Sequence, residues 1–248
     1  MNSTLRTHLD QLVRILAAMR RPVVVTQDAR QRDWDAVARL GVGSTFFIIV
    51  TLAFVGAIMM LHGGYQAGRI VGDPGLVGPQ VIPLFVRQLG PTLTGLMIAT
   101  RVGTGIAARI GSMVVTEQVD ALRLSNACPV HFLVRPPLKA CFWMLPVLTV
   151  LGIAAAFGSG LVTAYVVFDT APGTYADWSF VSALDAVEAM LKASAYGIAI
   201  PLIAGACGLA TWGGSAGVGR ATTNAVVACS LAVIILDFCI GACVLVLR

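Results

Sequence analysis

The run GSTFFIIVTLAFVGAIMM, from Gly43 to Met60, decides what kind of fold this chain can adopt. It holds no charged residue, and about 20 helical residues are enough to cross the hydrocarbon core of a bilayer. Four further apolar runs follow, so we expect five membrane-spanning helices: Gly43–Leu61, Val81–Ile110, Ala140–Phe168, Ala189–Trp212 and Ala225–Leu247. With a mean hydropathy of +0.85 and 57% hydrophobic residues, the chain is predicted to be an all-α polytopic membrane protein.

The first 42 residues differ from this pattern, and we separate region 1–42 from a transmembrane domain, 43–248. Apolar residues recur there at helical spacing with polar residues between them: Leu5, Leu9, Leu12, Leu16 and Met19. Such an amphipathic pattern predicts an N-terminal helix lying in the membrane interface, and a soluble packing helix is the alternative. It lacks the unbroken apolar core of a signal peptide.

Basic residues fall mainly on one side of the predicted spans. Twelve of the 17 lie before the first span, between the second and third, or between the fourth and fifth. Because loops rich in Lys and Arg stay in the cytoplasm, we expect a cytoplasmic N-terminus and a C-terminus on the outer side. The formal charge of +5 does not indicate nucleic-acid binding, since most Arg residues flank apolar runs instead of forming a basic stripe.

The second predicted span carries a ladder of small residues. They recur every four positions: Gly95, Ala99, Gly103, Ala107 and Gly111. Small side chains let a second helix approach closely, which a lipid-facing helix does not need. We interpret the ladder as a buried packing ridge, either within the chain or across a dimer.

A polar stretch, MVVTEQVDALRL at Met113–Leu124, interrupts the apolar sequence between the second and third spans. As one helix it would divide into an outer face with Glu117, Asp120, Ala121 and Leu124 and an inner face with Val115, Val119 and Leu122. Thr116 could cap its start. Geometry alone leaves two interpretations open: a docking surface for a cytoplasmic partner, or a solvated loop helix.

We single out four ionisable residues within the predicted spans, where charges are costly and usually face protein or a cavity: Arg87, Arg101, Lys192 and Asp237. Arg87 and Lys192 lie toward the outer ends of their spans and could hold an anionic lipid headgroup; snorkelling to the interface is the alternative. Tyr65 could border the same pocket or belong to an interfacial aromatic belt. We expect Arg101 and Asp237 to be structural partners or caps.

Signatures of catalysis are incomplete. The stretch GGSAG, Gly213–Gly217, matches G-x-S-x-G, and HGGY at His62 is like an oxyanion-hole loop. However, no His follows Ser215 and the only later acid is Asp237, so a membrane esterase is a weak alternative. The chain has no P-loop, its three His residues are scattered, and its Cys residues have no metal-ligand spacing. We expect no metal and no cofactor on this chain.

Two long stretches together resemble a known family. LGPTLTGLMIATRVGTGIAARIGSMVVTEQVDAL (Leu89–Leu122) and GGSAGVGRATTNAVV (Gly213–Val227), the latter followed by ILDF, are similar to the MlaE/YrbE permeases. These are the membrane subunits of ABC lipid transporters that work with MCE proteins. The likeness runs from about Gly41 to the end of the chain and extends to the N-terminal interfacial helix.

The resemblance implies that the polar stretch is a coupling helix docking on a cytoplasmic ATPase, through Glu117, Gln118, Asp120, Ala121 and Leu122. It also implies a homodimer in the bacterial inner membrane, with an MCE protein outside, and ATP and Mg held by the separate ATPase. A phospholipid pocket is expected near Arg87, Gln88, Lys192 and Tyr65. The rival functions are an ATP-independent carrier or channel and a membrane scaffold without transport.

Two positions depart from the family pattern. The usual RELGP motif has a neutral amide at Gln88, which would remove a possible intramembrane ion pair with Arg87. The usual acid before LGTM is replaced by Arg109. These changes put in question the polarity of the lipid pocket and a charge contact beside the coupling helix.

Overall fold

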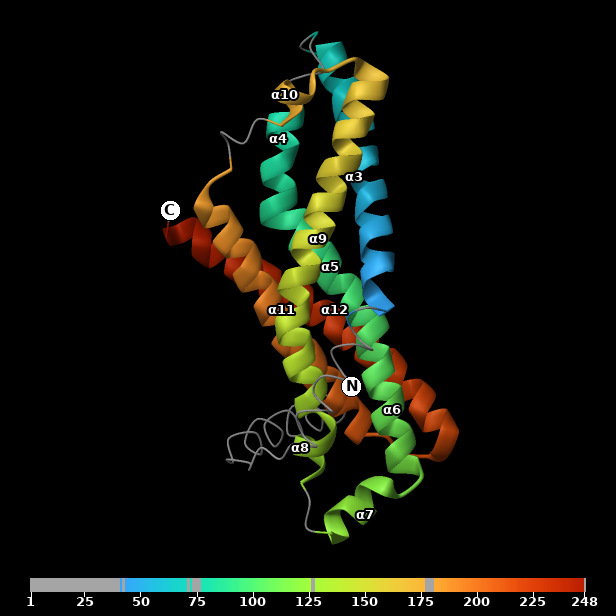
Figure 1. Cartoon of the computed structure of the whole chain (residues 1–248). Helices are drawn as coiled ribbons and strands as arrows, with labels where there is room; N and C mark the ends of the chain where they lie inside the picture. The colour runs from blue at the N-terminus through green and yellow to red at the C-terminus, as the bar shows by residue number, and fades with distance from the viewer. Residues whose placement is uncertain are drawn as a thin grey trace. The chain divides into compact units, whose positions relative to one another are not determined.

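The computed structural model describes residues 41, 43–70, 72, 77–125, 128–176 and 181–247. The predicted N-terminal interfacial helix lies outside these ranges. Within them all regular structure is helical, and five helical segments are long and apolar enough to cross a membrane (Figure 1). The predicted all-α polytopic class and its five spans are therefore confirmed.

Long helices make up four of the spans, and a chain of shorter pieces makes up the second. Their bounds are α3 Gly43–Ile70, then α4 Val77–Leu84, η3 Phe85–Leu89, α5 Gly90–Ile98, η4 Ala99–Gly103 and α6 Thr104–Val115, then α8 Pro129–Leu133 with α9 Arg135–Phe168, then α11 Ala183–Leu209 and α12 Gly214–Leu247. Two short helices lie between spans: α7 Gln118–Leu124 and α10 Pro172–Tyr175.

Each helical segment extends beyond the apolar run that predicted it. The helix α3 continues through His62 to Ile70, and α12 begins at Gly214 instead of Ala225. The connection left between the predicted fourth and fifth spans, residues 213–224, is therefore mostly helix, because α12 begins at Gly214. Within it, Gly213 and Gly214, with φ of +84° and +71°, have the left-handed backbone that a tight turn requires.

The second span contains two π-helical turns that periodicity did not predict. They are η3, which holds Arg87 and Gln88, and η4, which holds Arg101. A π turn inserts an extra residue into an α-helix and often marks a functional position. Both turns therefore place charged side chains at orientations that a regular helix would not give.

The chain divides into two compact units, of which the first comprises Gly95–Met144 and Ser194–Asp237 with the chain up to Ser44. All five residues of the small-residue ladder are buried in this unit. A Cβ added at Gly95 would lie 2.7 Å from the Tyr196 ring, and one at Gly111 would lie 2.8 Å from the Thr211 hydroxyl oxygen. The ladder thus packs against α11 and the residues that follow it within the same chain.

The second unit comprises Thr45–Thr94, Leu145–Ala193 and Phe238–Arg248. Here α3 and α9 approach so closely that a Cβ at Gly56 would overlap the backbone of Ala156. The short helix α10 packs against α4 through the buried Tyr175, whose ring lies 5.4 Å from that of Phe157. Burial raises the pKa of Tyr175 to about 12, so its phenol stays neutral at physiological pH.

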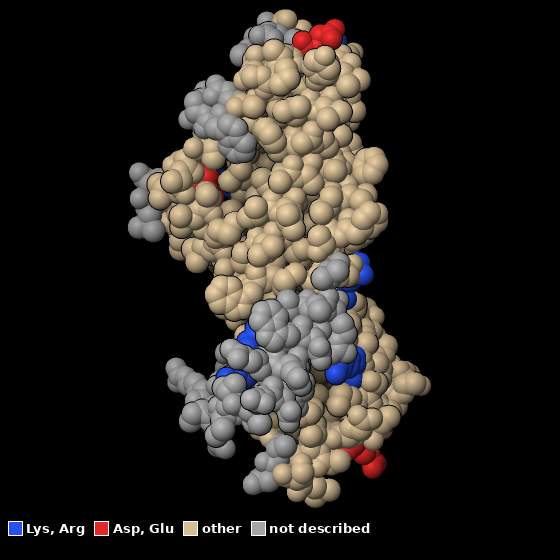
Figure 2. Space-filling model, in the orientation of Figure 1, with Lys and Arg blue, Asp and Glu red and all other residues tan. Residues whose placement is uncertain are grey.

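The outward faces of α3, α9 and α12 carry large apolar side chains, including Phe54, Trp143, Val166, Leu231 and Phe238. Figure 2 shows a face on which charged residues occupy a few separate patches between broad uncharged areas. An exposed apolar surface of this kind is stable when lipid tails replace water around it.

Candidate functional site

The polar stretch Met113–Leu124 is two helices and not one. Figure 1 shows α7 turning away from the end of α6, and Glu117 between them has a left-handed backbone with φ of +59°. Its N–H donates to the Val114 carbonyl oxygen at 3.1 Å, and its own carbonyl oxygen accepts from the N–H of Asp120 at 3.1 Å. Glu117 therefore ends one helix and begins the next.

This geometry corrects three expectations. Glu117 precedes α7 instead of sharing a helical face with Asp120, because its left-handed backbone breaks the period. Thr116 does not cap α7, since its hydroxyl donates back to the Ser112 carbonyl oxygen at 3.0 Å. Val115, predicted on the inner face, is exposed.

The exposed surface of α7 nevertheless carries the residues singled out from the sequence. Glu117, Gln118, Asp120 and Ala121 are exposed and Leu122 is half-buried. Val119, with 3% exposure, is the buried anchor of the helix, whereas Leu124 is 90% exposed. Asp120 pairs with Arg123 at 2.9 Å, but both are exposed and such a pair contributes little to stability. The helix therefore offers acids and a leucine to a partner.

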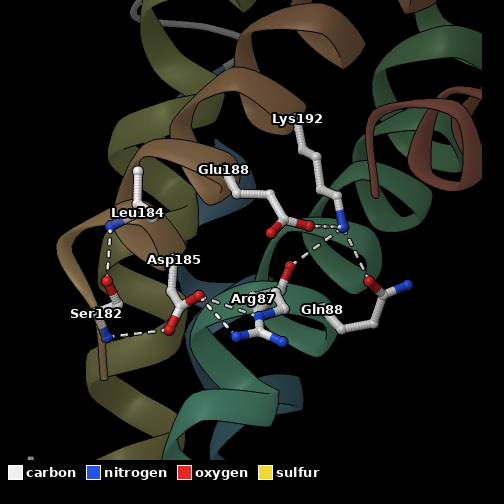
Figure 3. A network of polar contacts seen from close by, with 7 residues as sticks. All are labelled: Arg87, Gln88, Ser182, Leu184, Asp185, Glu188 and Lys192. Atoms are coloured by element: carbon white, nitrogen blue, oxygen red, sulfur yellow. Dashed lines mark hydrogen bonds and ion pairs between the residues drawn. The ribbon is translucent and has the colours of Figure 1, made fainter. Parts of the chain in front are cut away.

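A second polar site lies in the second compact unit, around Arg87 on η3 (Figure 3). Arg87 donates to Asp185 Oδ1 from Nε at 3.1 Å and from Nη2 at 2.8 Å. The Asp185 side chain is 1% exposed, and that of Arg87 is 40% exposed. Asp185 on α11 thus supplies the acidic partner for Arg87 that the neutral Gln88 cannot.

Asp185 is held in place by the start of its own helix. Its Oδ2 accepts the Ser182 N–H at 3.0 Å, and the Ser182 hydroxyl oxygen accepts the Leu184 N–H at 3.3 Å. This reciprocal arrangement is a capping box, which satisfies backbone donors at a helix N-terminus. One carboxylate thus fixes both the first turn of α11 and the guanidinium of Arg87.

Lys192 forms the other half of the network shown in Figure 3. Its Nζ lies 2.9 Å from Glu188 Oε1, donates to Gln88 Oε1 at 2.8 Å and donates to the Arg87 carbonyl oxygen at 3.3 Å. That carbonyl lacks its usual helical donor, because Pro91, four residues on, has no N–H. The Lys192 and Glu188 side chains are 0% and 4% exposed. Lys192 therefore completes the π turn as well as an ion pair.

Asp185 and Glu188 were not predicted as site residues. The predicted fourth span begins at Ala189, so both acids fell outside it, whereas α11 begins at Ala183. The available signal was the spacing of Asp185, Glu188 and Lys192, which are three and four residues apart and share one helical face.

The remaining candidates have contacts with other residues. Tyr65 is exposed near the end of α3, where the Arg69 guanidinium lies 5.7 Å from its ring centre. Arg101 is exposed on η4. Asp237, buried on α12, accepts a hydrogen bond from the Tyr196 hydroxyl at 2.9 Å, a partner that the sequence did not identify.

We expect Tyr196→Phe to destabilise the first compact unit. The change removes the hydroxyl that donates to the buried Asp237 carboxylate, and such a hydrogen bond contributes about 0.5–1.5 kcal/mol. Thermal unfolding of the purified protein should show a midpoint several degrees lower. Tyr165→Phe, at an exposed tyrosine of α9, is the matched control and should leave the midpoint unchanged. Equal midpoints for both variants would contradict the role of the hydrogen bond.

The described residues offer no support for the alternative chemistries. Among them no three His, Cys, Asp or Glu side chains are grouped to hold a metal ion. Ser215 lies in the first turn of α12, and the strand that a nucleophile elbow requires is missing from the described ranges. Cys141, Cys207 and Cys229 are buried, as packing residues would be, whereas Cys128, Cys239 and Cys243 are exposed.

Five apolar spans and a short exposed helix between the second and third define a polytopic membrane protein. The chain belongs to the MlaE permease family: the family described as Permease MlaE matches residues 34–243.

Relatives point the same way. The chain is 34% identical to a probable ABC transporter permease protein of Synechocystis, over 84% of this chain and 80% of the relative. It is 31% identical to one of Pyropia yezoensis, over 80% and 76%, and 34% identical to one of Rickettsia conorii, over 81% and 78%. Membership makes this chain a membrane permease subunit of an ABC transporter, a type of subunit that associates with an ATPase and is not itself an enzyme.

Proposed function

We propose that this chain is the permease subunit of an ATP-driven phospholipid transporter, moving lipid between the bacterial inner membrane and an MCE protein. The observation that carries the proposal is Arg87, a half-exposed guanidinium on a membrane-spanning segment, fixed by a buried carboxylate. A charge at such a position is costly unless it faces a water-filled cavity or contacts a partner or a ligand.

Arg87 has the geometry to hold a lipid phosphate. Its Nε and Nη2 are engaged by Asp185, while Nη1 makes no hydrogen bond among the described residues. A guanidinium with one edge fixed and the other open can bind phosphate in a defined orientation. The remaining predicted lipid residues have separate roles in the proposal. Lys192 and Gln88 hold the backbone at Arg87 in place. Tyr65 borders the headgroup from the end of α3.

We assign ATPase docking to α7, through Glu117, Gln118, Asp120, Ala121 and Leu122. Its exposure and its single buried anchor, Val119, support this assignment. The distribution of basic residues favours a cytoplasmic position for α7, a cytoplasmic N-terminus and a periplasmic C-terminus. The family resemblance favours a homodimer with two ATPase subunits, which carry ATP and Mg, and an MCE protein on the outer side.

Arg87→Gln should lower the amount of phospholipid retained by the purified transporter by about tenfold, because a charge-assisted phosphate contact contributes about 1.5–3 kcal/mol. Mass spectrometry of lipid extracted from the complex measures the effect. Arg69→Gln removes an exposed arginine from the same compact unit and is the matched control. Unchanged lipid in Arg87→Gln would reject the headgroup contact.

Reconstitution tests the function as a whole. The complex purified with its neighbouring chains should contain an ATPase and an MCE protein, and should transfer fluorescent phospholipid only when ATP is present. Transfer that continues without ATP would favour the carrier or channel, and a complex that transfers no lipid under any condition would favour the scaffold.

A further inference from the structure

We infer that Glu188 sets the charge of the Arg87 site: by offsetting the charge of Lys192 it keeps excess positive charge out of the network, so that the site accepts zwitterionic phospholipid in preference to anionic phospholipid. This inference rests on the proposed lipid function and names the substrate class and the residue that selects it. Glu188 acts through Lys192 and is a positioning residue.

The contacts of Lys192 identify where the balancing charge resides. Two side-chain oxygens lie at nearly equal distances from Nζ, Gln88 Oε1 at 2.8 Å and Glu188 Oε1 at 2.9 Å. Only the second belongs to a carboxylate. The second span therefore contributes a neutral acceptor, and α11 contributes the negative charge from one turn before the lysine.

The network balances charge in pairs. Arg87 is matched by Asp185, and Lys192 by Glu188. Three of the four side chains are at most 4% exposed, so only Arg87 can meet a ligand directly. Buried charges are screened weakly by solvent, so an unbalanced charge behind Arg87 would act on any headgroup that Arg87 holds.

A zwitterionic headgroup fits these conditions. Its phosphate can bind the open edge of Arg87, and its own cation offsets the phosphate charge, so that binding adds no net charge to the site. A headgroup with a net negative charge would add negative charge beside two buried carboxylates. Loss of the Glu188 charge would add one positive charge to the site and shift the preference toward anionic phospholipid.

Three variants test whether the lipid preference depends on the presence of a negative charge beside Lys192 or on the helix that carries it. Glu188→Gln removes it, Gln88→Glu adds a second one, and the double variant moves it across Lys192 to the second span. Each is purified with its partner chains from vesicles of equal phosphatidylethanolamine and phosphatidylglycerol, and the retained lipids are quantified by mass spectrometry. Asp169→Asn, which removes an exposed acid, is the control for total charge.

We expect Glu188→Gln to raise the retained ratio of phosphatidylglycerol to phosphatidylethanolamine about fivefold, as one basic charge near anionic lipid does. Gln88→Glu should lower the ratio, and the double variant and Asp169→Asn should keep the wild-type ratio. An equal ratio in all four variants would overturn the selection by charge.

Thermal unfolding of the same preparations tests the charge pairing of Glu188 with Lys192 independently of lipid binding. Glu188→Gln should unfold several degrees below the wild type, and the double variant should recover most of the loss. If the double variant unfolded at the same temperature as Glu188→Gln, the claim that a carboxylate beside Lys192 balances its charge would be wrong. Absence of phospholipid from the wild-type complex would instead reject the proposed function and the lipid preference. The unfolding temperatures would still test the pairing of Glu188 with Lys192.

Discussion

Reversing both Glu117 and Asp120 to lysine is expected to release the ATPase while leaving the permease folded. Both side chains are exposed on or beside α7, so their replacement removes no packing from the bundle. A surface built to receive acids would then face two cations, and such like-charge contacts cost several kcal/mol. We expect binding to weaken about 100-fold or more, measured by co-purification and by titration of the purified subunits.

Arg123→Gln is the control for this prediction. It breaks the exposed ion pair with Asp120 without reversing an acid, so it should keep the ATPase bound. A full complex recovered from the double lysine variant would show that α7 is a solvated loop helix and not a docking surface.

Gly56→Val is expected to prevent correct folding of the second compact unit. A Cβ at this position overlaps the carbonyl group of Ala156, which is backbone and cannot rotate away. Relief requires α3 and α9 to separate, and overpacking of this kind costs about 1–3 kcal/mol or more even where side chains can adjust. The variant should be lost from the membrane fraction or elute as aggregate in size-exclusion chromatography.

Gly158→Val provides the comparison. The residue lies on α9 near the same contact, but a Cβ there meets no atom within 4 Å. Valine at this position should leave expression and elution unchanged. If Gly56→Val behaved as well as Gly158→Val, the close approach of α3 and α9 would be wrong.

The sequence was sufficient for the class of fold because spanning a bilayer is a local requirement. A run such as Gly43–Met60 must satisfy its backbone hydrogen bonds within itself, and in lipid a helix does so. The five spans therefore followed from composition and length alone, and two long motifs gave the family. The helix ends did not follow, because helices continue through polar residues such as His62 wherever packing supports them.

The candidate sites were likewise only partly predictable from the sequence. The residues proposed to dock the ATPase could be named from one continuous stretch, whereas the left-handed turn at Glu117 that separates α6 from α7 had no signal in the helical period. Burial of the small-residue ladder followed from spacing, but its partners, among them Tyr196, came only from the packed helices.

By itself, then, the sequence determined the five spans and the family. Only the tertiary structure decided the pairing of Arg87 with Asp185, 98 residues away, and the joining of Lys192 to Gln88 and Glu188. The physical reason is that a buried charge is stabilised by the atoms within a few ångströms of it, whatever their distance along the chain. Helical periodicity places a side chain on a face, and only packing determines which charges that face meets.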